Sequence, residues 1–239
     1  MSDNPCLISV KNVSTHYGRI PMLIDVSLDV HRGHVCCVLG ANGAGKTTLV
    51  KTILGMVAAD RGQIALDGED ITAWPTHRRI AAGIQVASAG VGTFTKMTVE
   101  KNLKLGAYNV NDHHTLNERL EEVYASFPVL KDRLQQKAGT LSGGERTMLS
   151  IARAVINKPK LLIMDEPSLG LAPIVVEEVF RIVRRLNQEN GMTIMLVEQN
   201  VSKALQVSGF GYVIQKGQIL FSGDKEALLQ SEILENPIL

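Results

Sequence analysis

Apolar and polar residues alternate in short runs along the first third of the chain. The runs include ISVKNVSTHYG (residues 8–18), MLIDVSLDV (22–30) and QIALDGEDI (63–71), and Gly, Asp and Pro separate them. Alternation of this kind predicts strands with one buried face, and turn residues between such strands favour antiparallel pairing. We therefore expect an antiparallel sheet within residues 7–73.

Three other segments are apolar without alternation, which is typical of strands buried on both faces of a parallel sheet. They are HVCCVL (34–39), LLIMDE (161–166) and MTIMLVE (192–198). Residues 98–155 have a helical pattern, including a helix at 145–157, and a further helix is expected at 174–188. The tail, 211–230, predicts a hairpin and a short helix. The pattern indicates one α/β domain spanning 1–239, with a helical insertion at about 98–155.

The segment GANGAGKTT (40–48) connects the first buried strand to a helical pattern. Its glycine, lysine and threonine spacing matches the phosphate-binding loop in full. Glycines let successive backbone N–H groups face a phosphate, and the following helix adds its positive N-terminal end. We expect the lysine to reach the β- and γ-phosphates of ATP and the first threonine to bind Mg²⁺. The expected nucleotide-binding residues are Gly40, Asn42, Gly43, Ala44, Gly45, Lys46, Thr47 and Thr48.

Two carboxylates end the apolar run at 161–166, and ligands of parallel sheets bind at the carboxyl ends of the strands. We expect Asp165 to hold Mg²⁺, together with Thr47, directly or through water. Glu166 is then placed to polarise the water that attacks the γ-phosphorus.

The segment LSGGE (141–145) opens the helix predicted at 145–157 and offers a second anion site. Its candidate binding groups are Ser142, Gly143 and Gly144. One chain has no need of two such sites. The simplest use of the second is to cap the γ-phosphate of ATP bound by another copy in a head-to-tail dimer.

At these motifs the chain resembles the ATP-binding subunits of ABC transporters, and the resemblance covers nearly its whole length. DEPSLGLAP (165–173), LVEQN (196–200) and MTVEKNL (97–103) are similar to the branched-chain amino acid importer subgroup. The resemblance implies a P-loop core of ABC type, with an N-terminal antiparallel β subdomain and a helical insertion. It also implies that Tyr17 stacks on adenine.

Two positions depart from the family pattern. Gln199 stands where the family has a histidine that contacts the γ-phosphate, although this subgroup also carries Gln there. Ala89 stands where members usually have Gln or Glu that helps bind Mg²⁺ and contacts the membrane subunit, and Gln85 lies four residues earlier. Alanine has no oxygen to offer a metal. We expect Ala89 to weaken turnover without affecting ATP binding.

Composition and charge limit the classes of partner that the chain can bind. A nucleic-acid binder usually has a basic surface and aromatic residues that stack on bases. This chain has a net charge of +1, no basic run and an aromatic content of 4%, so we do not expect it to bind nucleic acid. The longest uncharged stretch, 80–95, is too short to span a bilayer. The start, MSDNPCLISV, has no secretory signal pattern. We expect a cytoplasmic protein, peripheral on the inner face of the cell membrane.

The leading interpretation is an ATP-hydrolysing subunit that powers a membrane importer, for branched-chain amino acids or related small solutes. Its partners would be a second copy or a paralogous ATP-binding subunit, transmembrane permease subunits and, indirectly, an extracytoplasmic solute receptor. Two alternatives remain: a degenerate module that binds ATP with little hydrolysis, and a soluble ABC-type ATPase of DNA maintenance or translation. The latter proteins carry coiled-coil insertions or tandem cassettes, which are missing here.

Overall fold

Two β-sheets organise the chain in the computed structural model, which describes residues 4–88, 92–110 and 112–231. The predicted antiparallel sheet is present, with the order β2-β1-β4-β5. Its strands are β1 (Cys6–Tyr17), β2 (Ile20–His31), β4 (Arg61–Leu66) and β5 (Glu69–Asp70).

The second sheet has six strands in the order β10-β9-β3-β8-β7-β6. They are β10 (Gln218–Asp224), β9 (Phe210–Gln215), β3 (Val35–Leu39), β8 (Thr193–Glu198), β7 (Leu161–Asp165) and β6 (Ile84–Ser88). All neighbours are parallel except β9 and β10, which form the predicted hairpin. Strand β6 has no counterpart among the predicted elements, because IQVAS places Gln and Ser in a short run that lacks the apolar continuity of β7.

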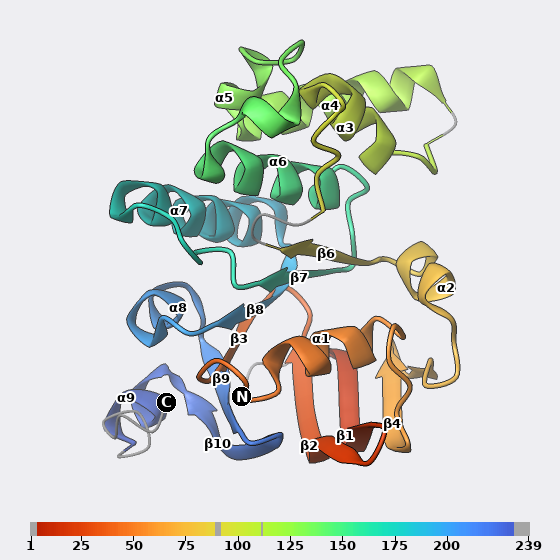
Figure 1. Cartoon of the computed structure of the whole chain (residues 1–239), viewed down its shortest axis with the longest axis vertical. Helices are drawn as coiled ribbons and strands as arrows, with labels where there is room; N and C mark the ends of the chain where they lie inside the picture. Colours follow the sequence, from red (N-terminus) through yellow and green to blue (C-terminus); the bar gives the residue numbers. More distant parts are fainter. Residues whose placement is uncertain (1–3, 89–91, 111, 232–239) are drawn as a thin grey trace.

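The predicted helical insertion gathers at one end of the molecule, opposite the antiparallel sheet (Figure 1). It contains α3 (Val99–Gly106), α4 (His113–Ser126), α5 (Pro128–Lys131), a 3₁₀ turn (Ala138–Thr140) and α6 (Gly143–Val155). Helix α6 begins earlier than expected because Ser142 caps its N-terminus. The remaining helices are α1 (Lys46–Ile53), α2 (Thr76–Ala81), α7 (Pro173–Asn190), α8 (Val201–Val207) and α9 (Lys225–Gln230).

Each face of the six-stranded sheet packs in a different core, because successive side chains of a strand point to opposite faces. One face packs against the helical insertion and α7 through residues that include Cys37, Leu39, Leu162, Met164 and Leu196. The other packs against α1 and the antiparallel sheet through residues that include Cys36, Val38, Leu161, Ile163 and Val197. Strands β3, β8 and β7 are thus held from both sides.

The register of these strands brings three loops to one edge of the sheet. Leu39 at the end of β3 lies opposite Glu198 at the end of β8. Val197 in turn lies opposite Asp165, which ends β7. The loops that follow β3, β7 and β8 therefore emerge side by side, at the carboxyl edge where parallel sheets bind ligands.

Candidate nucleotide site

The predicted phosphate-binding loop joins β3 to α1, and close contacts define its shape. A Cβ atom on Gly40 would lie 2.4 Å from the carbonyl oxygen of Ile214, so the loop can approach β9 only with glycine. Gly45 has a φ of 111°, a conformation that other residues rarely adopt. The turn of the β9–β10 hairpin supports the loop, since the Gly217 N–H donates to the Ala44 carbonyl at 2.8 Å.

Lys46 connects this loop to the acidic strand. Its side chain is buried, and its ammonium donates to the carbonyl oxygens of Gly40 at 2.6 Å and Ala41 at 2.9 Å. It also forms an ion pair with Glu166, at 3.0 Å from Oε1. The prediction that Lys46 and Glu166 share one site thus agrees with their contact, although 120 positions separate them.

Asp165 has an unusual environment. Its Oδ1 is buried and has no hydrogen-bond partner within the described residues. Burial, and then the charge of Glu166, raise the pKa of Asp165 above its ordinary value. A buried carboxylate oxygen without a donor suits a cation, and Thr47 presents an exposed hydroxyl in the first turn of α1.

No group of three or more His, Cys, Asp or Glu side chains is arranged for a metal ion in the part of the chain that the structure describes. Mg²⁺ at a nucleotide site fits this finding, because it usually takes one or two protein ligands and completes its shell with phosphate and water. The residues present therefore fit Mg²⁺ held with a nucleotide.

A pocket of about 320 Å³ opens beside Glu166, and residues that follow β7 and β8 line it. Glu166 has a φ of 51°, and its N–H donates to the Val197 carbonyl at 2.9 Å. Strained backbone of this kind clusters at functional sites. Gln199, immediately after β8, is exposed and lines the same pocket.

Glu198 is a pocket residue that the sequence analysis does not single out. Its side chain is 2% exposed, and its Oε1 accepts from the Ser168 N–H at 3.0 Å. Its Oε2 accepts from the N–H groups of Gln199 and Asn200 at 3.1 and 3.4 Å. An acid that ends an apolar strand, as Asp165 does in β7, is the signal that would have identified it.

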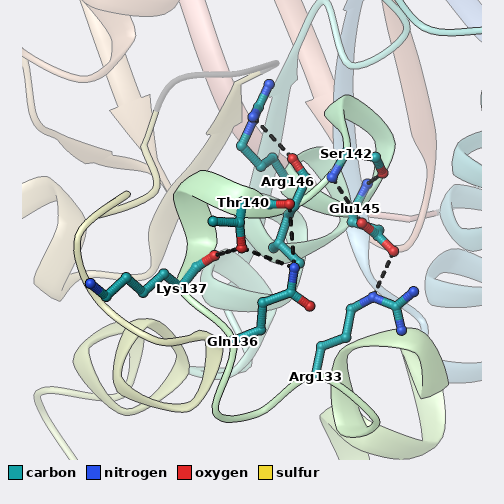
Figure 2. Close-up of polar contacts among 8 residues, drawn as sticks. Arg133, Gln136, Lys137, Thr140, Ser142, Glu145 and Arg146 are labelled. Carbon is teal, nitrogen blue, oxygen red and sulfur yellow. Dashed lines mark hydrogen bonds and ion pairs between the residues drawn. The ribbon is translucent and has the colours of Figure 1, made fainter.

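The second predicted anion site opens α6. The Ser142 hydroxyl accepts from the Glu145 N–H at 3.3 Å, and Glu145 Oε2 accepts from the Ser142 N–H at 2.8 Å. This reciprocal pair is a capping box, drawn in Figure 2. Ser142 and Gly143 are exposed, whereas Gly144 is buried against α7.

Tyr17 ends β1 with a ring that is 40% exposed. Its hairpin, β1–β2, adjoins the phosphate-binding loop, because a Cβ atom on Gly45 would lie 3.2 Å from the Met22 carbonyl. The hairpin therefore presents an aromatic residue on the side of the molecule where the loop lies.

The remaining predicted site residues differ in their position and exposure. Asn42 and Gly43 are exposed in the loop, and Thr48 is buried in α1. Helix α6, which Ser142 caps, and helix α1, which follows the phosphate-binding loop, pack on opposite faces of the six-stranded sheet (Figure 1), so the two predicted anion sites of one chain are separate. Ala89 lies outside the described residues. Gln85 lies in β6 and pairs in register with Leu162 of β7.

A larger pocket, of about 650 Å³, lies at the opposite edge of the same strands and contains none of the predicted site residues. Three of its four basic side chains have acidic partners, since Arg32 and Lys160 pair with Asp67 and Lys158 pairs with Glu122, whereas Arg119 donates to the Ile156 carbonyl. The predicted residues Glu166 and Gln199 line the pocket at the carboxyl edge instead.

The glycine-rich loop joins a central parallel strand to a helix and faces a pair of carboxylates at the end of a nearby strand. This arrangement defines a P-loop nucleotide-binding domain. Residues 23–169 match the family model described as ABC transporter. The chain belongs to the ABC transporter family, as an ATP-binding subunit. Among the residues that the structure describes, no helix has the length and hydropathy needed to cross a bilayer.

Curated relatives cover almost the whole chain. The high-affinity branched-chain amino acid transport ATP-binding protein BraG of Pseudomonas aeruginosa is 43% identical over 93% of this chain and 95% of its own. The probable branched-chain amino acid transport ATP-binding protein LivF of Archaeoglobus fulgidus is 37% identical, over 96% and 97%. The lipopolysaccharide export system ATP-binding protein LptB of Escherichia coli is 33% identical, over 94% and 93%.

Solved structures agree with the fold. A nucleotide-free ATP-binding cassette from an ABC transporter superposes with a TM-score of 0.86, at 27% identity over 98% of this chain and 96% of that one. A cassette in its ADP conformation gives a TM-score of 0.83, at 28% identity over 97% and 98%. The expected fold, with its antiparallel subdomain and helical insertion, is confirmed.

Proposed function

We propose that this chain hydrolyses ATP with Glu166 as the general base and that hydrolysis drives a separate membrane permease. The contact between Lys46 and Glu166 carries the proposal, because it puts the phosphate-binding lysine and the candidate base in one site. The family to which the chain belongs couples ATP hydrolysis to transport.

Each remaining residue has a proposed role. Backbone N–H groups from Gly40 to Thr48 bind the phosphates, while Lys46 supplies positive charge to the β- and γ-phosphates. Thr47 and Asp165 hold Mg²⁺, which neutralises charge on the phosphates. Gln199 donates a hydrogen bond near the γ-phosphate, and Tyr17 stacks on adenine.

The separation of the two anion sites supports a head-to-tail dimer. Ser142 and Gly143 of one copy are exposed and would cap the γ-phosphate bound by the other. The second copy is this chain or a paralogous ATP-binding subunit. The pair would act on permease subunits at the inner face of the membrane, with an extracytoplasmic receptor as an indirect partner.

Branched-chain amino acids or related small solutes are the proposed cargo. Support comes from BraG and LivF, whose names state branched-chain amino acid transport and which are more similar to this chain than LptB. The permease that co-purifies with the chain would test this assignment. Copurification with a lipopolysaccharide exporter would contradict it.

Weak hydrolysis is a second candidate, prompted by Ala89 and Gln199. In that case the chain would act as an ATP-dependent interaction module. Phosphate release by the protein together with its permease distinguishes the two, since a module would form ATP-dependent complexes without it.

Glu166→Gln tests the proposed base. We expect hydrolysis to fall by roughly 10²- to 10³-fold, because an amide cannot accept the proton of the attacking water. ATP binding should persist, and Glu177→Gln, on the exposed side of α7, is the control. Equal hydrolysis by Glu166→Gln and wild type, with ATP still bound, would show that another group is the base.

A further inference from the structure

The N-terminus of α6 carries a negative charge of its own. Glu145, in the first turn, uses Oε2 to accept from the Ser142 N–H. Burial opposes ionisation of Glu145, but the hydrogen bonds from Ser142 and the charge of Arg133 outweigh it and hold the pKa of Glu145 below its ordinary value. Glu145 is therefore a carboxylate at neutral pH.

This carboxylate has the same sign as the phosphate that the start of α6 is proposed to receive. The backbone N–H groups of Gly143 and Gly144 attract an anion. Glu145 lies one or two residues further on, within one helical turn of about 5.4 Å. At such a separation two negative charges repel each other appreciably, even near the surface.

Arg133 opposes that repulsion. Its Nε lies 2.8 Å from Glu145 Oε1, the oxygen that the capping box leaves free, as Figure 2 shows. Glu145 is thus bound on one oxygen by the Ser142 N–H and on the other by a guanidinium.

The segment that carries Arg133 is held by local hydrogen bonds, and α5, which precedes it, packs in the same core as α6. The Arg133 N–H donates to the Leu130 carbonyl at 3.1 Å. The Gln136 side-chain amide donates to the Thr140 hydroxyl at 3.0 Å and to the Thr140 carbonyl at 3.3 Å. From the α6 side, Arg146 donates to the Leu141 carbonyl at 3.1 Å. The bonds of Gln136 and Arg146 are drawn in Figure 2 and fix the chain on both sides of the Arg133–Glu145 pair.

We propose that Arg133 is a positioning residue that neutralises Glu145, so that the γ-phosphate of ATP held by the other copy can dock at the N-terminus of α6. The inference rests on the proposed head-to-tail use of LSGGE. Arg133 acts on the phosphate through Glu145 and not by touching it.

A double-mutant cycle tests this role in the purified protein with the membrane and ATP-binding partners that co-elute. The variants are Arg133→Ala, Glu145→Gln and the double variant, and the readout is the KM for ATP in steady-state hydrolysis. We expect Arg133→Ala to raise KM about fivefold, the effect of one poorly screened charge at this range. Glu145→Gln keeps the capping box, which accepts either residue, and removes the charge that repels the phosphate, so its KM should be no higher than that of wild type.

The decisive comparison is made in the Glu145→Gln background. There Arg133→Ala should change KM by less than about twofold, because no carboxylate is left to neutralise. The defect of the single Arg133→Ala variant should also shrink, relative to wild type, between about 0.1 and 1 M KCl, as screening increases. Arg133→Lys, which keeps the charge, should lie between wild type and Arg133→Ala.

Controls separate this role from a general loss of structure. Arg181→Ala removes an exposed partner of Glu178 on α7 and should leave KM unchanged. The melting temperature of Arg133→Ala should stay within about 3 °C of wild type, since a partly exposed ion pair contributes about 1 kcal/mol or less to stability.

Three outcomes would overturn the inference: an Arg133→Ala variant with wild-type KM, a defect equally large in the Glu145→Gln background, or a defect insensitive to salt. The second would mean that Arg133 contacts the phosphate itself or supports the fold. Wild-type protein that neither hydrolyses ATP nor associates in its presence would instead contradict the proposed function.

Discussion

Three carboxylates end two neighbouring strands, and each has a different environment. Asp165 has a buried oxygen without a partner, Glu166 pairs with Lys46, and Glu198 accepts three backbone N–H groups. Because the environments differ, the same type of side chain can bind metal, accept a proton and hold a loop. Each role leads to a different expected effect of substitution.

Asp165→Asn should stabilise the protein in the absence of metal. Folding raises the pKa of Asp165, so the folded chain binds a proton more tightly than the unfolded chain. The free energy of unfolding therefore falls as the pH rises from the pKa of Asp165 in the unfolded chain through its higher pKa in the folded chain. With a chelator present, the gain in melting temperature over wild type should be larger at pH 8 than at pH 5. Asp132→Asn, at an exposed position, should show no such trend, and a destabilised Asp165→Asn variant at pH 8 would contradict the assignment.

Glu198→Gln should lower kcat about tenfold and change the KM for ATP less than twofold. The amide loses one acceptor and turns its NH₂ toward backbone donors, which releases Ser168 and Gln199 beside Glu166, the proposed base. Steady-state hydrolysis gives both constants, and Glu189→Gln, on the exposed end of α7, is the matched control. An unchanged kcat would mean that Glu198 has no part in positioning the pocket.

Sequence alone identifies Asp165 and Glu166 because they directly follow an apolar run. The same signal marks Glu198, but not the groups that Glu198 binds, and nothing in the sequence marks Arg133, because these roles depend on partners from other segments. Glu198 binds the Ser168 N–H, which its own strand does not predict. Arg133 looks like an ordinary surface arginine until α6 is placed beside it.

At the scale of elements, α6 begins at the predicted second anion site and packs closely against α7 at Gly144. A Cβ atom on Gly144 would lie 2.3 Å from Cγ1 of Val175, whereas one on Gly143 would lie 3.5 Å from Leu171. The sequence predicts that LSGGE opens α6, but it sets the start of the helix two residues later than the Ser142 cap does. The need for glycine at the crossing follows only from the position of α7.

Gly144→Ala should therefore lower the free energy of unfolding by about 1–3 kcal/mol, the usual range for overpacking, even though alanine is the better helix former. Urea denaturation measures the change. Gly143→Ala, where the added methyl meets only ordinary van der Waals contact, should cost less than about 1 kcal/mol. Equal effects of the two substitutions would mean that the helices separate freely at this crossing.

At the scale of the molecule, the two sheets are joined by hydrogen bonds as well as by their shared core. The Tyr212 hydroxyl on β9 accepts from the Asp29 N–H on β2 at 2.9 Å and lies 3.1 Å from the Asp29 carbonyl. Burial raises the pKa of Tyr212 to about 12, so the hydroxyl keeps its proton and can donate.

Tyr212→Phe should cost about 1 kcal/mol, because it removes the hydroxyl and leaves the Asp29 backbone groups without this partner. The midpoint of urea unfolding should fall while its slope stays constant, since the surface exposed on unfolding is unchanged. Tyr108→Phe, at a ring that is 61% exposed, should have no measurable effect. An unaltered midpoint for Tyr212→Phe would show that the core alone joins the sheets.

The position of β3 between β8 and β9 has a consequence for synthesis on the ribosome. This strand is buried along its whole length and leads into the phosphate-binding loop, yet both of its neighbours come from the last quarter of the chain. At a synthesis rate of about 5–20 residues per second, roughly ten seconds or longer pass between the synthesis of β3 and that of β8 and β9. A nascent chain that stalls before β8 therefore exposes an unpaired apolar strand and has no complete nucleotide site, which makes it a substrate for chaperones.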